Sequence, residues 1–274
     1  MSRNFCVSLI SGVAMTLIVL THAPAQALDP VATYLFNGNF NAVQPGAPLL
    51  IPADPLGTSA FISDTVFGET RTVYAFNGHA SPVNELAGLT LNTTGLIASD
   101  NYSIEMVSSF SDRNGAWRRL IDVQNRQSDE GFYVDSSNTL DVYPVSGSPN
   151  TFTNNVYHDI ILTDANTGVV KAYLDGQLQF TINTTQMHLN NLNNPNLLMN
   201  FFLDNTVGGG QGEFSNGKIG LIRAYNGVLT DSEINIIGSH PFAPAPSSVF
   251  TLLLGGVPGI IALSLRHKRK KATL

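Results

Sequence analysis

The feature that most constrains this chain is an alternation of apolar and polar residues through its middle. The alternation is clearest in residues 102–110, 140–144 and 197–204. Successive side chains of a β-strand point to opposite faces of a sheet, so this period of two predicts strands that place one face on a core. Turn sequences such as Asp175-Gly176 separate the runs. Many short strands joined by turns predict an all-β fold, an antiparallel two-sheet sandwich of the jelly-roll type.

The sequence predicts one short helix, near the end of this middle region. Thr230 precedes Asp231-Ser232-Glu233. The Thr230 side chain can therefore cap the first turn while Glu233 reaches back to complete a capping box. We expect the helix to end at Ile237.

Two segments lack a regular period. Residues 41–70 contain four prolines and predict a long surface excursion. Asparagine is dense in residues 183–205, which predicts a turn-rich loop. The alternative for this second segment is an asparagine-rich binding edge.

The N-terminal end has the pattern of a secretory signal peptide, predicted at residues 1–27. Arg3 is followed by the uncharged apolar run 5–20, and Ala25-Gln26-Ala27 offers small residues before a cleavage site. The alternative is an uncleaved membrane anchor, for which this run is short. Cleavage leaves residues 28–242 as one domain, which is long enough for a single core.

The C-terminal end has three parts in order. A Pro- and Ser-containing segment at 243–248 is followed by an uncharged apolar segment at 249–265 and a basic cluster at 266–271. An apolar segment directly before basic residues predicts a membrane helix whose basic end stays in the cytoplasm. The acidic middle of the chain would then lie outside.

This tail resembles the PEP-CTERM sorting signal of Gram-negative bacteria, in which a Pro-Glu-Pro motif, one membrane helix and a basic end are handled by an exosortase. Ala245 stands where the family has Glu. The resemblance implies that residues 243–274 anchor the protein transiently in the inner membrane, and that an exosortase-type enzyme processes the tail. The protein would then be secreted or displayed at the cell surface. The positions that match the motif are Pro244, Pro246, Ser247 and Ser248.

The charge distribution excludes one class of partner. All 20 acidic residues lie between Asp29 and Glu233, together with eight of the 14 Lys and Arg residues, which leaves this region with a net charge of −12. Proteins gain affinity for nucleic acids by neutralising phosphates. We therefore expect no nucleic-acid partner.

Three further groups of residues follow one another along the chain: 31–38; 156–163 with 170–176; and 214–219 with 223–226, Leu229 and 232–234. In that order they resemble the opening strand, the central hairpin, and the closing strand with helix of laminin-G-like domains of the concanavalin A-like lectin/glucanase superfamily. Gly220 stands where the family usually has an Asp at the rim. The resemblance implies two packed curved sheets and the binding of carbohydrate or protein, sometimes with Ca²⁺. It does not imply catalysis.

The carboxylates show no catalytic pattern along the sequence. Laminarinase-type glycoside hydrolases of similar architecture place Glu-x-Asp-x-x-Glu on one strand, and retaining cleavage needs two carboxyl groups about 5–5.5 Å apart. Here Glu105 is the only acid of its run, and Asp129-Glu130 are neighbours that would point to opposite faces. His158 lies in an apolar strand pattern, which favours a structural histidine over a general base. We expect no enzyme activity.

A candidate ligand-binding face lies opposite the predicted core. Aromatic rings stack on the C–H faces of sugars, and neighbouring amides and carboxylates bond the sugar hydroxyls. The alternative is an ordinary solvated sheet face. The candidate residues are Asp122, Gln124, Tyr133, Asp135, Asp141, Tyr143, Asn200, Phe202 and Asp204.

Two further hypotheses concern the single tryptophan and a metal. Trp117 is either a plug at the core or edge, or a platform for a ligand. A Ca²⁺ site is permitted because this ion prefers oxygen ligands, although no spacing specifies it. The candidate ligands are a subset of Asp112, Asp122, Asp135 and Asp204.

Together these patterns predict a secreted, surface-sorted, non-catalytic β-sandwich that binds extracellular or envelope polysaccharide. The alternative is a structural or adhesive protein of the extracellular matrix that engages protein partners. A third reading is a weak glycoside hydrolase or lyase.

Overall fold

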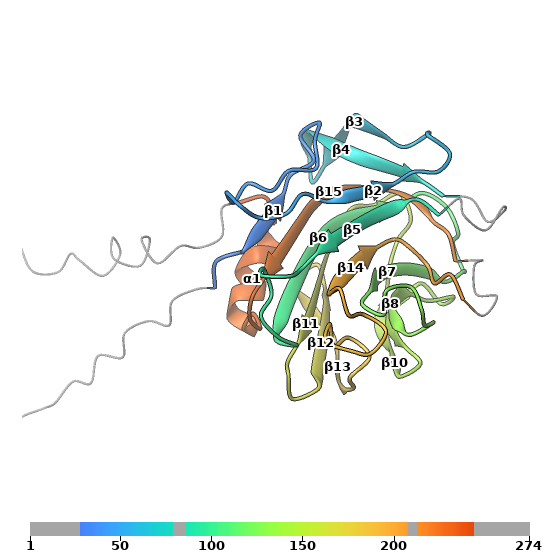
Figure 1. Ribbon diagram of the computed structural model, residues 1–274. Helices are drawn as coiled ribbons and strands as arrows, with labels where there is room; N and C mark the ends of the chain where they lie inside the picture. The colour runs from blue at the N-terminus through green and yellow to red at the C-terminus, as the bar shows by residue number, and fades with distance from the viewer. Residues whose placement is uncertain (1–27, 79–85, 208–212, 244–274) are drawn as a thin grey trace, which may run out of the picture.

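The computed structural model describes residues 28–78, 86–207 and 213–243. These residues form two antiparallel sheets packed face to face, with a helix on the outside (Figure 1). The architecture confirms the predicted two-sheet sandwich. The first sheet has the strand order β13 (Gln177–Asn183), β12 (Val169–Leu174), β11 (His158–Asp164), β6 (Tyr102–Phe110), β15 (Asn216–Tyr225), β4 (Glu69–Asn77) and β3 (Ala60–Val66), with β1 (Ala32–Tyr34) paired to β15. The second has the order β10 (Ser146–Thr151), β9 (Thr139–Tyr143), β8 (Gly131–Val134), β7 (Arg118–Asp122), β14 (Leu198–Phe201), β5 (Gly88–Asn92) and β2 (Ile51–Ala53).

The core lies between the two sheets and follows from the alternation in the sequence. In β6, Ile104 and Met106 point inward, and so do their partners Leu162 and Ile160 on β11. The opposite face of β6 is also buried, because the helix and the segment at 241–243 cover the outside of the first sheet. The first sheet is therefore closed to ligands over β6 and β15.

Helix α1 (Asp231–Ser239) covers part of this outer face, beside β15 and β1 (Figure 1). The Thr230 hydroxyl accepts a hydrogen bond from the Glu233 N–H, and the Glu233 carboxylate accepts one from the Thr230 N–H at 2.7 Å. The predicted capping box is therefore present. Ile234 and Ile237 are buried against β11, β12 and β15, and the helix continues two residues beyond the predicted end.

The expectation of a long surface excursion at 41–70 is wrong, because β2, β3 and the start of β4 lie in this segment. Pro52 is tolerated since β2 is an edge strand of the second sheet. β3 and β4 form a hairpin whose turn, Phe67 and Gly68, has positive φ at both residues. β2 and β3 are largely exposed, so their residues show little alternation.

The asparagine-dense segment forms a turn-rich loop before β14, as predicted. Asn191 Nδ2 donates to the carbonyl of Val123 at 2.8 Å, which ties the loop to the end of β7. Asn194 Oδ1 accepts from the N–H of Leu198 at 2.8 Å and so positions the start of β14. These amides replace backbone hydrogen bonds that an irregular segment lacks.

In the part of the chain that the structure describes, no helix has the length and apolar character to cross a membrane. The predicted signal peptide at 1–27 lies outside the described residues. So do the sorting motif at 244–248, the apolar segment at 249–265 and the basic cluster.

Candidate functional site

Three aromatic rings gather on the outer face of the second sheet. Trp117 lies just before β7, Tyr133 is on β8 and Tyr143 ends β9. Phe132 and Val134 point into the core, which places Tyr133 on the opposite face. The ring centroids lie 5.4, 5.5 and 6.5 Å apart with planes close to perpendicular, the favoured edge-to-face geometry. We call Trp117, Tyr133 and Tyr143 the aromatic cluster.

The aromatic cluster is open to solvent at one side. Tyr143 is 37% exposed and Trp117 is partly buried, whereas Tyr133 is only 1% exposed. Asp141 lies opposite Tyr133 in the strand register, and its Oδ1 is buried without a hydrogen-bond partner. Burial, and then the Asp135 carboxylate, raise the pKa of Asp141 to about 6. The site thus combines exposed ring surface with an unused acceptor.

A fully buried guanidinium, that of Arg119, lies beside the aromatic cluster. Its Nη1 is 3.0 Å from Asp122 Oδ1, and its Nε is 3.5 Å from Asp204 Oδ1. Its Nη2 lies 3.7 Å from Asp129 Oδ1 and donates to the Tyr133 hydroxyl. The guanidinium carbon is 4.6 Å from the centroid of the Tyr133 ring. Arg119 therefore joins the aromatic rings to a group of carboxylates.

Asp122 and Asn200 use their polar atoms within the protein. Asn200 Nδ2 donates to Asp122 Oδ2 at 2.8 Å, and the Thr90 hydroxyl donates to Asn200 Oδ1 at 2.7 Å. The N–H of Arg126 donates to Asp122 Oδ2 at 2.9 Å. This arrangement links β5, β14 and β7 across the sheet, which indicates a structural role for both side chains.

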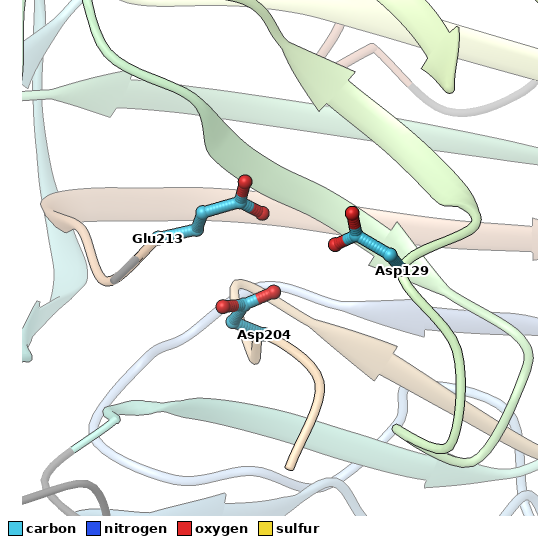
Figure 2. A group of neighbouring side chains, drawn as sticks. All are labelled: Asp129, Asp204 and Glu213. Carbon is cyan, nitrogen blue, oxygen red and sulfur yellow. The ribbon is translucent and has the colours of Figure 1, made fainter. Parts of the chain in front are cut away.

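Three carboxylates, those of Asp129, Asp204 and Glu213, turn toward one another (Figure 2). Two of them, Asp129 and Asp204, lie beside the Arg119 guanidinium. Asp129 belongs to the β7–β8 connection, Asp204 follows β14 and Glu213 precedes β15. One oxygen from each lies within 4.8 Å of the others. Burial, followed by the charges of Asp204 and Asp129, raises the pKa of Glu213 to about 8, and burial also raises the pKa of Asp204. We call these three residues the acidic cluster.

The sequence shows no strand with a pair of catalytic carboxylates, and the acidic cluster lies outside the strands. The folded chain does bring carboxylates to within 4.8 Å of one another, but it does so from three loops. Such a group suits either proton transfer or the binding of a hard cation.

The arrangement of strands and the sequence now identify the family. Residues 85–235, more than half of the chain, match the family model of the concanavalin A-like lectin/glucanases superfamily. The chain belongs to this superfamily. No curated protein matches it at the level of sequence.

Solved structures share the fold of this concanavalin A-like domain. Domain 4 of AbnA, an extracellular GH43 arabinanase of Geobacillus stearothermophilus solved with arabinotriose, is 15% identical with a TM-score of 0.58, over 78% of this chain and 100% of that one. The binding domain of botulinum neurotoxin DC in complex with SialylT is 14% identical with a TM-score of 0.51, over 79% and 51%. The binding domain of Paraclostridial Mosquitocidal Protein 1 is 11% identical with a TM-score of 0.51, over 77% and 52%. The chain thus spans about half the length of the two toxin domains.

The concanavalin A-like sandwich brings most of the predicted site residues to one face. Three of them lie in or beside the aromatic cluster, and three contact or adjoin Arg119. Tyr133, which contacts Arg119, connects the two groups. The six residues are Tyr133, Asp141, Tyr143, Asp122, Asn200 and Asp204.

Gln124 and Asp135 lie at the ends of strands and use their side chains there. Gln124 donates to the carbonyl of Gln186 at 3.3 Å and accepts from Asn193 at 3.1 Å, which ties it to the asparagine-rich loop. Asp135 Oδ1 accepts from the N–H of Thr139 at 2.7 Å and closes the turn between β8 and β9. Neither is part of the aromatic cluster.

The prediction that Phe202 lies on the open face is wrong. Phe202 is fully buried in the core and stacks on Phe76 with centroids 4.2 Å apart. The strand β14 ends at Phe201, and Phe202 has a positive φ of 63°. Because the extended backbone ends there, the strict alternation between faces ends with it.

The sequence analysis did not select Arg119, Asp129 or Glu213. For Arg119 a signal existed, since alternate residues of a strand share a face and Trp117 is two positions earlier. Asp129 and Glu213 lie in connections between strands, where no periodicity reports which way a side chain points. Their approach to Asp204 is a product of the tertiary structure.

The calcium ligands named from the sequence do not come together in the described residues. Asp112 accepts hydrogen bonds from the N–H and Nδ2 of Asn216 at 3.0 and 2.7 Å, away from the other candidates. Asp135 closes a turn, and Asp122 is paired with Arg119. Of that set, only Asp204 belongs to the acidic cluster.

His158 is buried and fully engaged by neighbouring groups. Its Nδ1 lies 2.7 Å from Asp175 Oδ2, and its Nε2 accepts from the N–H of Thr153 at 3.1 Å. Its ring also packs 4.5 Å from the ring of Phe152. These contacts agree with the prediction of a structural histidine.

Proposed function

We propose that this protein is a secreted, surface-sorted module that binds extracellular or envelope polysaccharide without cleaving it. The proposed binding site is the aromatic cluster together with Asp141. One observation carries the proposal: Tyr143 is 37% exposed beside an Asp141 oxygen that is buried and without a partner. A sugar ring placed there would meet a flat apolar surface, and because the Asp141 residue as a whole is only partly buried, a turn of its carboxylate would bring the unpartnered oxygen to a sugar hydroxyl.

The chemistry of a sugar matches these groups. Its C–H faces pack on aromatic rings, and its hydroxyls donate to carboxylate oxygens. Trp117 and Tyr143 supply the ring surface, and Asp141 supplies the acceptor. Tyr133, whose hydroxyl is held by Arg119, contacts both other rings edge to face. The rings are therefore held in place before a ligand arrives, which reduces the entropy lost on binding.

The solved structures support the ligand class. The arabinanase domain, with a TM-score of 0.58, was solved with the oligosaccharide arabinotriose. The neurotoxin binding domain with a TM-score of 0.51 was solved with SialylT. At identities of 15% and 14% the likeness covers the fold, so the location of the site depends on the geometry of this chain.

The burial of Asp204, one member of the acidic cluster, supports binding without cleavage. A glycosidase places two carboxyl groups on either side of the glycosidic bond, so both must reach the substrate. Asp204 is fully buried, and its Oδ1 faces Arg119. Release of reducing ends from a polysaccharide by the purified protein would contradict this part of the proposal.

The binding test compares the wild type with Tyr143→Ala and Phe67→Ala. Phe67 is a matched control, because it is an exposed aromatic (49%) at the β3–β4 turn, on the other sheet. Losing one well-packed ring contact costs about 1 kcal/mol, so Tyr143→Ala should weaken polysaccharide binding by about fivefold or more. Phe67→Ala should bind like the wild type. Affinity is measured by pull-down with insoluble polysaccharides and by glycan array.

Two outcomes would contradict the assignment. Equal binding by Tyr143→Ala and the wild type would remove the aromatic cluster as the site. Failure to bind any glycan, with recovery of a specific protein partner, would favour the alternative of an adhesive matrix protein.

The location is proposed from the two ends of the sequence. A cleaved signal at 1–27 would export the chain, and the tail at 243–274 would anchor it until an exosortase-type enzyme processes the motif. Fractionating cells that express the chain with and without 243–274 tests this. We expect the shortened chain to be lost from the envelope fraction, and an unchanged distribution would contradict the sorting proposal.

A further inference from the structure

We propose that the acidic cluster of Asp129, Asp204 and Glu213 is a Ca²⁺ site. The carboxylates come from three separate connections, and their nearest oxygens lie within 4.8 Å of one another (Figure 2). The proposal does not rest on polysaccharide binding, because the acidic cluster and the aromatic cluster use different side chains. The ion could bind whether or not the rings bind a sugar.

Asp204 gives the clearest sign of a missing ligand. The residue is completely buried, and its Oδ1 is directed toward Arg119 Nε at 3.5 Å. Its Oδ2 has no hydrogen-bond partner, and neither does the buried Oε2 of Glu213. Buried polar atoms in folded proteins are almost always satisfied, so these two oxygens call for a further group in the gap between the carboxylates.

Arg119 is not the missing partner of Asp204 Oδ2 and Glu213 Oε2. Its Nη1 is used by Asp122 at 3.0 Å, and its Nη2 donates to the Tyr133 hydroxyl and to the Asp129 carbonyl. The distances from the guanidinium to Asp204 and Asp129, 3.5 and 3.7 Å, exceed those of a good charged hydrogen bond. The guanidinium lies at the side of the acidic cluster and contacts neither Asp204 Oδ2 nor Glu213 Oε2.

The charges of this region balance with a divalent cation. Four carboxylates, the acidic cluster and Asp122, contact or adjoin Arg119. The other guanidinium of the region is that of Arg126, whose Nε donates to the Asp204 carbonyl at 2.6 Å. With every group ionised, two negative charges remain. Without a cation, neutrality requires protonation, and burial next to Asp204 and Asp129 indeed raises the pKa of Glu213 to about 8.

The ligand atoms favour Ca²⁺ over other divalent ions. All of them are carboxylate oxygens, which disfavours Zn²⁺, since that ion prefers nitrogen and sulfur. Ca²⁺ binds oxygens at about 2.3–2.6 Å in flexible geometry, so two of its ligands can lie up to about 5 Å apart. Mg²⁺ at about 2.0–2.1 Å would require the three loops to move closer.

A bound ion would link the β7–β8 connection, the segment after β14 and the segment before β15. Arg119 connects these segments to the aromatic cluster, because it lies beside Asp204 and donates to the Tyr133 hydroxyl. We therefore expect Ca²⁺ to stabilise the fold. Extracellular calcium modules have dissociation constants of about 10⁻⁴–10⁻³ M, so 10 mM Ca²⁺ should raise the melting temperature by roughly 3–10 °C relative to EDTA.

The decisive experiment compares Glu213→Gln with Glu130→Gln in the purified protein. The control removes one negative charge from the β7–β8 connection, next to the site but outside the acidic cluster. Glu213→Gln should lose the rise in melting temperature caused by Ca²⁺. In EDTA it should melt at or above the wild-type temperature, because a buried carboxylate that repels its neighbours has been removed. Glu130→Gln should keep the full Ca²⁺ response.

Titration calorimetry with Ca²⁺ on the same three proteins gives the stoichiometry, expected to be one ion in the wild type and Glu130→Gln. The absence of any Ca²⁺ response in the wild type would overturn the proposal. An equal response in Glu213→Gln and the wild type would overturn it too. The melting curve in EDTA shows that each variant is folded, so loss of the response cannot be attributed to unfolding.

Discussion

Arg119 organises the open face of the second sheet through its own contacts. The guanidinium is buried, lies 3.0 Å from Asp122, and holds the hydroxyl of Tyr133. It also lies 3.7 Å from one oxygen of Asp129 and 3.5 Å from one oxygen of Asp204. A buried charge is tolerated only when its partners are in place, and the same holds for these carboxylates.

Arg119→Met should therefore destabilise the protein by about 3–5 kcal/mol, because it leaves buried carboxylates without their cation. Lys171→Met is the control. Lys171 pairs with the exposed Asp231 at 2.9 Å, and an exposed pair contributes about 1 kcal/mol or less. Urea unfolding of both variants measures the difference. Similar losses in the two variants would mean that Arg119 is not the centre of a buried network.

At the scale of elements, the ends of strands and helices decide which residues reach the surface. β14 is only Leu198–Phe201, and Leu197 and Phe202 on either side have positive φ. This short strand places Asn200 on the open face and returns Phe202 to the core. Helix α1 begins at a capping box that also anchors the first described residue, since the Leu28 N–H donates to Glu233 Oε1 at 2.7 Å.

The capping box yields a prediction for the stability of this element. Thr230→Ala removes the side-chain acceptor for the Glu233 N–H and should cost about 0.5–2 kcal/mol. Ser232→Ala changes an exposed residue in the same first turn and should stay within about 0.5 kcal/mol of the wild type. Thermal unfolding followed by circular dichroism compares the two. Equal melting temperatures would show that the cap contributes nothing to the folded protein.

At the scale of the whole molecule, buried carboxylates make stability depend on pH. Asp164 is the last residue of β11, and neither of its carboxylate oxygens has a hydrogen-bond partner. Burial, and then the Asp100 carboxylate, raise its pKa to about 8. His188 lies 3.7 Å from each of the two carboxyls, and Tyr102 is the register partner of Asp164. The group is therefore neutral in the folded protein over a range in which it ionises in the unfolded chain.

Asp164 should make the protein less stable as the pH rises. The unfolded chain releases this proton near pH 4, whereas the folded protein holds it to about pH 8, so the folded state is progressively disfavoured between these values. Asp164→Asn has no group that titrates at this position, so it should not lose stability for this reason as the pH rises. The melting temperature of this variant relative to the wild type should thus be higher at pH 8 than at pH 5. A difference that stays constant with pH would contradict the assignment.

Much of the fold could be predicted because its signals are local. Residues 102–110 alternate because β6 packs one face on the core, and Thr230 and Glu233 form a capping box within one turn. The segment 41–70 was misread because β2 and β3 are exposed edge strands with little alternation. The candidate site was found in part, since Tyr133, Asp141 and Tyr143 follow the period of their strands.

The sequence by itself determined which side chains of a strand share a face, because an extended backbone turns each residue opposite to the last. It therefore predicted that Tyr133 and Tyr143 lie on the open face. The absence of catalytic carboxylates, also expected from the sequence, remains a prediction. The tertiary structure alone decided that Asp129, Asp204 and Glu213 meet, and that Phe202 turns inward. These residues lie in connections or at strand ends, where no period operates and only the packing of the two sheets sets direction and distance.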